Sequence, residues 1–124
     1  MAKLLVVDDE KELVDLIRLL LEKDGHEVIS AHSGTEALEV LSRQTPSMIL
    51  LDVTMPDMDG YTLVSNLQSD DATRDIPVIV LTGREGLRET FELFSNVVGF
   101  VLKPFDVKDL RARVQTSLEK AAAR

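Results

Sequence analysis

The sequence contains no cysteine and only two histidines, His26 and His32, both at expected loop or strand-edge positions. Without cysteine the chain can form no disulfide, no thiol nucleophile and no thiolate metal site. Two histidines without matching ligands cannot hold zinc unless carboxylates help, so any bound metal ion should have oxygen ligands. We expect both histidines to be solvated or locally hydrogen-bonded.

Long hydrophobic runs and an excess of positive charge are also missing. No apolar run approaches the roughly 20 residues of a membrane span, and the start MAKLLVVDDE places acids where a secretory signal needs apolar residues. The 14 basic residues oppose 22 acidic ones, which gives a net charge of -8 that repels nucleic acid and anionic lipid. We therefore expect a soluble cytoplasmic protein with no direct nucleic-acid binding and no membrane insertion.

The 124 residues, 44% of them hydrophobic, suit one domain with a buried core. We expect this single domain to span residues 1–124, with residues 119–124 as the alanine-rich end of a helix. No repeat, linker or low-complexity segment is visible.

Compact apolar runs alternate with amphipathic segments along the chain. The runs indicate buried parallel strands around residues 4–7, 28–29, 48–51, 78–81 and 100–102. Apolar residues at helical spacing predict a first helix through Leu13, Leu16, Ile17, Leu20 and Leu21, and a last one through Val107, Leu110, Val114 and Leu118. A third helix is expected from near Gly60 to before Asp70, and a fourth from about Arg84 to Ser95.

Local signals agree with this alternation. Gly25 is predicted to close the first helix in the left-handed conformation, and Asn96 to do the same for the fourth. Ser33 and Glu36 have the capping-box spacing that begins a second helix, and Asp106 is the expected N-cap of the last.

Strictly alternating strands and helices predict an α/β fold: a doubly wound, five-stranded parallel sheet with five helices on its two faces. In such folds, ligands bind beyond the carboxyl ends of the strands. The residues expected at that edge are Asp8, Asp9 and Glu10 after the first strand, Asp52 after the third, Thr82 after the fourth, and Lys103 and Pro104 after the fifth.

Three of these residues, Asp8, Asp9 and Asp52, bring carboxylates to one edge of the sheet. Close carboxylates repel, so they must protonate, stay solvated or share a cation. Magnesium prefers a few carboxylates together with water and phosphate oxygens. Lys103 would add a positive charge suited to phosphoryl oxygens. The cluster therefore predicts a magnesium site that handles phosphoryl groups.

These motifs resemble the receiver domain of the two-component response regulators, in the layout of the single-domain chemotaxis type. The resemblance covers essentially the whole chain. It rests on Asp8-Asp9, on Asp52 within the segment LDVTMPDMDG (51–60), on Thr82-Gly83, and on Lys103-Pro104-Phe105. It implies a flavodoxin-like three-layer sandwich with strand order 2-1-3-4-5.

The resemblance also implies a role for each metal-site residue. Asp52 would be the phosphoacceptor. Asp9 and Asp52 would bind Mg²⁺ directly, Asp8 through water, and Thr54 through its backbone carbonyl, with Mn²⁺ as a possible substitute. A carboxylate needs no general base, so the reaction would depend on positioning and charge neutralisation.

The same resemblance assigns a switch. Thr82 and Lys103 would hold the phosphoryl oxygens, and Phe100 would turn inward as Thr82 moves. The bond between Lys103 and Pro104 is expected to be cis. The face made by the fourth helix, fifth strand and fifth helix would then change.

As a function, this predicts a phosphorylation-controlled interaction module and not a turnover enzyme. The phosphodonor would be a histidine kinase or a histidine phosphotransfer protein. Because we expect no output domain within residues 1–124, the signal would pass to a separate protein, through a phosphorylation-dependent homodimer, or along a phosphorelay.

Three other functions are weaker. A pseudo-receiver scaffold that is never phosphorylated would not need the complete set of Asp8, Asp9, Asp52, Thr82 and Lys103. A haloacid-dehalogenase-type phosphatase needs a second acid two residues after the nucleophile, where this chain has Thr54. A flavodoxin-type nucleotide binder needs a phosphate-cradling first loop, which the acids after the first strand would repel.

Two further segments have no assigned chemistry. Asp57 and Asp59 are expected in a turn that ends at Gly60, with Tyr61 partly packed at the start of the third helix. The stretch 96–99 is unusually apolar. It predicts either a buried Val97 with a flexible Gly99 or an exposed docking face.

Overall fold

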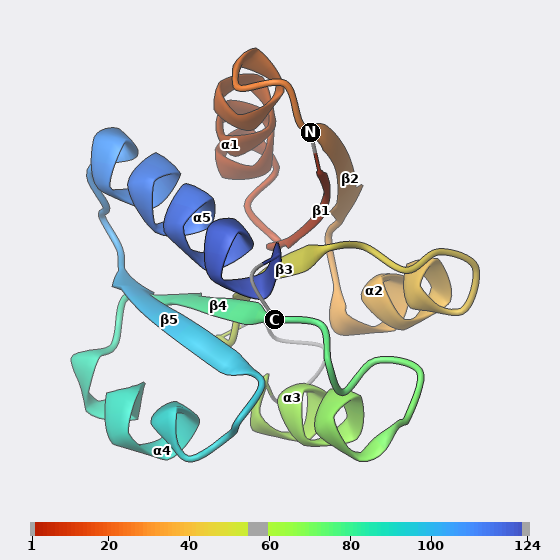
Figure 1. Cartoon of the computed structure of the whole chain (residues 1–124). Helices are drawn as coiled ribbons and strands as arrows, with labels where there is room; N and C mark the ends of the chain where they lie inside the picture. Colours follow the sequence, from red (N-terminus) through yellow and green to blue (C-terminus); the bar gives the residue numbers. More distant parts are fainter. Residues whose placement is uncertain (1, 55–59, 123–124) are drawn as a thin grey trace.

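The computed structural model describes residues 2–54 and 60–122 (Figure 1). Within these residues, five strands alternate with five α-helices and one short 3₁₀ turn, η1. In chain order they are β1 (Lys3–Val7), α1 (Lys11–Lys23), β2 (Glu27–Ala31), α2 (Gly34–Leu41), β3 (Met48–Asp52), α3 (Gly60–Ser69), β4 (Val78–Thr82), η1 (Glu85–Leu87), α4 (Arg88–Glu92), β5 (Val97–Leu102) and α5 (Val107–Ala122).

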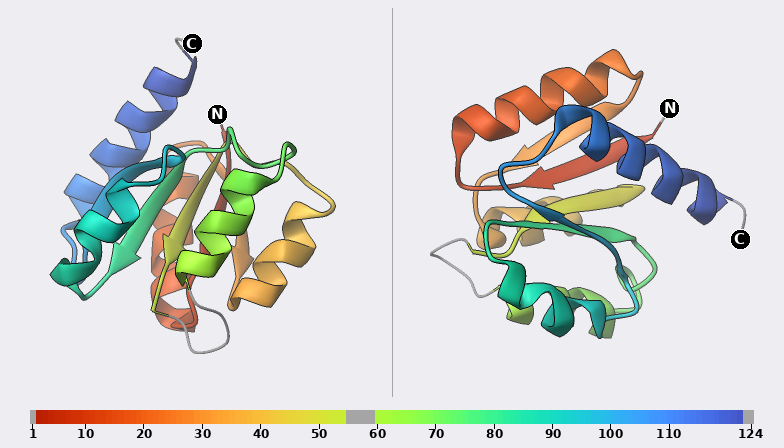
Figure 2. Two further views of the ribbon diagram at one scale, coloured as in Figure 1. Left: turned by 90° about the horizontal axis from the view of Figure 1, so that it is seen from below. Right: turned by 90° about the vertical axis from the view of Figure 1, so that its left-hand side faces the viewer.

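All neighbouring strands are parallel, and their order across the sheet is β2-β1-β3-β4-β5. Figures 1 and 2 show α1 and α5 on one face of this sheet and α2, α3 and α4 on the other. The predicted fold class and strand order are therefore confirmed. Because every strand runs the same way, the carboxyl ends of β1, β3, β4 and β5 share one edge.

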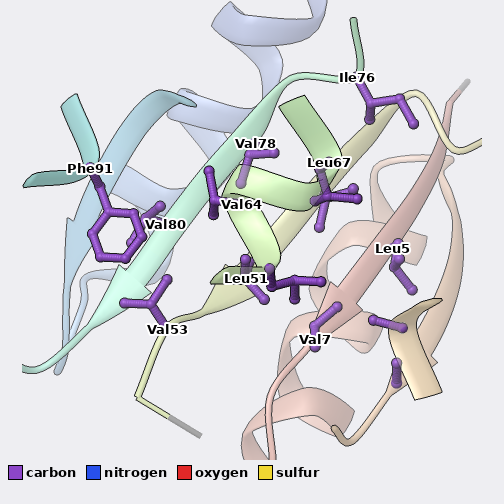
Figure 3. Close-up of a cluster of buried hydrophobic side chains, with 14 of the residues drawn as sticks. Leu5, Val7, Leu51, Val53, Val64, Leu67, Ile76, Val78, Val80 and Phe91 are labelled. Carbon is purple, nitrogen blue, oxygen red and sulfur yellow. The ribbon is translucent and has the colours of Figure 1, made fainter. Parts of the chain in front are cut away.

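Each face of the sheet carries its own hydrophobic core. Leu51, Val64, Val80 and Phe91 come from β3, α3, β4 and α4 and belong to one cluster (Figure 3). The opposite cluster joins the other side chains of the same strands to α1 and α5. Strands buried on both faces explain the near-continuous apolar runs in the sequence.

The first helix is amphipathic, and its buried stripe matches the predicted one at Ile17 and Leu21 but not at Leu16. Val14, Ile17 and Leu21 are buried, whereas Leu16 is 44% exposed. The apolar residues of α1 are spread over more than one side of the helix. Their spacing alone therefore could not show which side packs on the sheet. Across residues 2–54 and 60–122, no helix is both long and apolar enough to cross a membrane.

Three predicted helix ends are confirmed. Gly25 has a φ of 91°, the left-handed conformation that closes α1. The hydroxyl of Ser33 accepts a hydrogen bond of 3.0 Å from the N–H of Glu36 at the start of α2. The carboxylate of Asp106 accepts one of 2.7 Å from the N–H of Lys108 at the start of α5.

The predictions for the fourth helix are wrong in two respects. Instead of one helix over residues 84–95, the chain forms η1 and then the five-residue α4. Gly86 disfavours a regular first turn. Asn96 does not take the left-handed conformation. Its carbonyl accepts a hydrogen bond of 2.8 Å from the N–H of Val78, so its backbone already joins the sheet.

The apolar stretch before β5 is partly packed and partly open. The pairing of β4 with β5 is irregular beside Val78, so that Val97 pairs with Val78 and Gly99 with Ile79. Val98 lies between them and is 41% exposed. Val97 is half-buried, so the edge presents apolar surface without being a fully open face.

Gly60 links α3 to the end of β3 by close contact. A Cβ atom at Gly60 would lie 2.4 Å from the Cβ of Val53 and 2.6 Å from its Cα. Val53 directly follows Asp52, so this contact fixes the chain beside that side chain. Glycine is needed here because the backbones approach too closely for any side chain.

We predict that Gly60→Ala destabilises the protein by about 1–3 kcal/mol, because the methyl group must displace the Val53 backbone. Urea unfolding of both proteins measures the difference. Gly86→Ala is the matched control, because a Cβ atom there meets nothing within 4 Å. Equal unfolding midpoints for Gly60→Ala and the parent would contradict the close-packing account.

Candidate functional site

Three carboxylates meet where β1 and β3 end. Asp8 follows the last residue of β1, Asp52 is the last residue of β3, and these strands are neighbours. Oxygen atoms of Asp8, Asp9 and Asp52 lie within 4.8 Å of one another. Asp8 and Asp52 are 0% and 2% exposed, whereas Asp9 is exposed. The structure thus brings together the predicted acidic cluster.

Lys103 supplies the positive charge of this site. Its ammonium group lies 2.7 Å from Oδ2 of Asp8, 3.2 Å from Oε1 of Glu10 and 3.3 Å from Oδ2 of Asp52. Lys103 follows β5, which is separated from β1 by two strands. A long side chain is therefore required to reach the acids from that position.

Both oxygens of Asp52 are held. Oδ1 accepts hydrogen bonds from the N–H of Thr54 at 2.9 Å and from its hydroxyl at 2.7 Å. Oδ2 faces Lys103. These contacts fix the carboxylate in one orientation at the edge of the sheet.

Asp8 is the most buried acid of the site. Its Oδ1 accepts a hydrogen bond of 2.9 Å from the N–H of Glu10, and its Oδ2 faces Lys103. Burial raises the pKa of Asp8, and the nearby charge of Asp52 acts in the same direction, although the hydrogen bonds from Lys103 and Glu10 oppose the rise. Asp8 therefore depends on a cation nearby to stay ionised.

Lys103 shows the complementary effect. Burial alone would lower its pKa, but the hydrogen bond to Asp8, the charges of Asp8 and Asp52, and the bond to Glu10 outweigh burial and raise the pKa. Lys103 is therefore a fixed ammonium charge at neutral pH.

Thr82 is the last residue of β4 at this edge of the sheet, and Phe100 lies on the neighbouring β5, where it pairs with Val80. Thr82 is fully buried, and its hydroxyl accepts a hydrogen bond of 3.2 Å from the N–H of Arg84. Its carbonyl accepts one of 2.8 Å from the N–H of Lys103, which joins the two residues through the backbone. Phe100 is 4% exposed. The bond between Lys103 and Pro104 is cis, as the resemblance implies.

Two contacts of the site were not predicted. Glu10 binds Lys103, and the hydroxyl of Thr54 binds Asp52. Glu10 stands next to the acidic pair, so its position in the sequence was a usable signal. The expected turn with Asp57 and Asp59 lies outside the described residues.

The side chains present fit a hard divalent cation. Three carboxylates with oxygens this close are suitable ligands for Mg²⁺, which usually keeps several waters and leaves room for phosphate oxygens. Asp9 is the exposed member and faces solvent. An ion here would compete with Lys103 for the charge of Asp8 and Asp52.

Comparisons with known proteins agree with this geometry. The family model of the response regulator receiver domain matches residues 4–115. The transcriptional regulator RpaA of Synechocystis is 33% identical over 97% of this chain and 50% of its own length. The response regulator PleD of Caulobacter vibrioides is 40% identical over 93% of this chain and 26% of its own length. The chain thus spans half or less of these relatives.

Solved structures give the same result. A CheY-like receiver domain protein of Methanospirillum hungatei superposes with a TM-score of 0.91 at 25% identity, over 99% of this chain and 98% of its own. The response regulator TrrA of Thermotoga maritima, in complex with Mg²⁺ and BeF, gives a TM-score of 0.83 at 27% identity, over 94% and 98%. With the strand order and the family match, these findings place the chain in the response regulator receiver domain family.

Proposed function

We propose that Asp52 accepts a phosphoryl group from a histidine kinase or a histidine phosphotransfer protein. The observation that carries this proposal is the buried Asp52 carboxylate, oriented by Thr54 and facing the Lys103 ammonium beside two further acids. A purely structural acid buried at a strand end would need a partner for its charge, but it would not gain from two further carboxylates beside it. We place the exchange in the cytoplasm as part of the same proposal.

In the proposed reaction, a carboxylate oxygen of Asp52 attacks the phosphorus of a phosphohistidine. A P–O bond forms, the P–N bond breaks, and its electron pair returns to the imidazole of the donor. A carboxylate nucleophile has no proton to give up, so no base is needed. Lys103 and the hydroxyl of Thr82 would hold the phosphoryl oxygens, and Thr54 keeps Asp52 in position.

Magnesium would be held by Asp9 and Asp52 directly, by Asp8 through water and by the carbonyl of Thr54, and Mn²⁺ could replace it. When bound, the ion neutralises the crowded carboxylates and the phosphoryl charge. Asp9 is exposed and close to the buried pair, which supports its role as the entry-side ligand.

A cavity beside the site supports the docking of a donor protein. It has a volume of about 350 Å³, and its lining includes Leu13, Leu16, Lys103, Pro104 and Phe105. Leu16, which the packing of α1 leaves exposed, thus lines the same cavity as Lys103, the residue that contacts Asp52. An apolar donor helix seated there would be near Lys103.

The output would be a change of the surface formed by α4, β5 and α5. As Thr82 turns toward the phosphoryl group, Phe100 would adjust on the neighbouring strand, and the altered face would bind a downstream protein or a second phosphorylated copy. A phosphorylation-independent scaffold is the weaker function, because every residue of the acceptor site is present.

We predict that saturating Mg²⁺ raises the thermal midpoint of the parent protein, with a stabilisation of about 2.7 kcal/mol at 100 times the dissociation constant. Asp9→Asn should lose most of this increase, because it removes one of three carboxylates. Asp75→Asn, at an exposed acid outside the cluster, is the matched control. The same increase in Asp9→Asn as in the parent would place the ion elsewhere.

We predict that acetyl phosphate and Mg²⁺ together form a single adduct that base and hydroxylamine remove. Intact-mass spectra should show the adduct in the parent and in Asp75→Asn, and lose it without Mg²⁺ or in folded Asp52→Asn. An adduct that persists in Asp52→Asn would move the acceptor to another residue.

We predict that Thr82→Ala still forms the adduct but loses most of the phosphorylation-dependent change in residues 84–105. Backbone amide shifts with and without beryllofluoride measure this change. Thr73→Ala serves as a control, because it also removes a buried hydroxyl but outside the site. A full parental pattern of shifts in Thr82→Ala would show that Thr82 does not transmit the signal.

A further inference from the structure

The first residue of α4 covers the proposed switch residue. The guanidinium carbon of Arg88 lies 4.7 Å from the centroid of the Phe100 ring. A cation within about 6 Å of an aromatic face is attracted by the negative charge density of the ring. Since Phe100 is 4% exposed, Arg88 forms part of the cover that buries it.

Two acids hold Arg88 in this place. Its Nε donates to Oε1 of Glu85 at 3.0 Å, and Nη2 lies 3.4 Å from Oε2 of the same residue. Nη1 lies 3.9 Å from Oε1 of Glu92. The hydrogen bond to Glu85 is the main cause that raises the pKa of Arg88. Arg88 therefore ties η1, the end of α4 and the Phe100 ring together.

The sheet register connects this contact to the acceptor site. Phe100 pairs with Val80, and Leu102 pairs with Thr82. Side chains alternate between the faces of a strand, so these four residues point to the same face. Phe100 thus lies on the strand next to that of Thr82, two residues before the Leu102 that pairs with Thr82. Arg88 in turn contacts the Phe100 ring.

We propose that Arg88 is a positioning residue: its charge holds Phe100 in the buried position and couples the ring to the start of α4. The coupling to phosphorylation rests on the proposed function, whereas the contact itself does not. Any rotation of Phe100 must break the contact between its ring and the guanidinium of Arg88. The ion pairs with Glu85 and Glu92 keep that guanidinium in place beside η1 and α4. Arg88 therefore sets both the orientation of the ring and how strongly α4 follows it.

Fluorine NMR of protein labelled with 4-fluorophenylalanine tests the contact without any ligand. Phe100→Leu assigns the Phe100 resonance. Arg88→Gln should displace this resonance, because more of the molecules then have an exposed Phe100 ring. The ratio of molecules with a buried ring to those with an exposed ring should fall about two- to fivefold, as expected for the loss of an exposed cation–π contact. Arg88→Lys should keep most of the parental position, because it keeps the charge.

Arg84→Gln is the matched control, an exposed arginine four residues earlier whose side chain makes no ion pair within the described part of the chain. It should leave the Phe100 resonance unchanged, and circular dichroism establishes that each variant is folded. A parental resonance in Arg88→Gln, or an equal displacement in Arg88→Gln and Arg88→Lys, overturns the proposal.

A second measurement, with Mg²⁺ and beryllofluoride, tests the coupling. Arg88→Gln should show a larger change at Phe100 than the parent and a smaller change of the amide shifts in residues 88–92. If the change at Phe100 and the change of the amide shifts in residues 88–92 have the same ratio in the parent and in Arg88→Gln, the coupling of the ring to α4 through Arg88 is overturned. If the parent does not respond to beryllofluoride while Arg88→Gln still displaces the resonance, the proposed switch fails and the positioning role of Arg88 stands.

Discussion

The structure depends on the burial of two like charges at neighbouring strand ends. Asp8 and Asp52 are almost completely buried where β1 and β3 end, and two carboxylates this close cannot both stay ionised without a cation. Lys103 provides that cation from β5. The parallel sheet makes the arrangement possible, because it brings the carboxyl ends of strands distant in sequence to one edge. A buried charge left without its partner would cost far more than an exposed ion pair contributes.

The same lysine connects the site to the edge of the sheet that carries the proposed output. Its side chain reaches across to the acids, while its N–H donates to the carbonyl of Thr82. Thr82 and Phe100 follow on β4 and β5, and Arg88 extends this series to α4. Helix α4 is short and follows the 3₁₀ turn η1. It therefore has few hydrogen bonds of its own that would resist a shift of its position. The proposed output therefore involves an element with few internal hydrogen bonds.

Sequence patterns predicted the fold because each signal was local and strong. Buried parallel strands require apolar runs, and Gly25, Ser33 and Asp106 end or begin helices through contacts within a few residues. Errors arose where tertiary contacts decide. Leu16 follows helical spacing, yet Val14 is buried instead, because the sheet selects one side of an apolar helix. Asn96 pairs with β4 rather than closing α4. The contacts of long charged side chains, such as that of Glu10 with Lys103 or of Arg88 with Phe100, follow no periodic pattern in the sequence.

Under the proposed function, charge balance also constrains the order of events at the site. A shift from 1:99 to 99:1 between two shapes needs about 5.5 kcal/mol, more than the about 1 kcal/mol of one hydroxyl hydrogen bond from Thr82. Lys103 must contribute, but it already contacts Asp8, Glu10 and Asp52. It can turn to a phosphoryl group only when another cation neutralises Asp8. The need for a divalent ion therefore follows from the occupied lysine as much as from the crowded acids, and binding of ion and phosphoryl group should be cooperative.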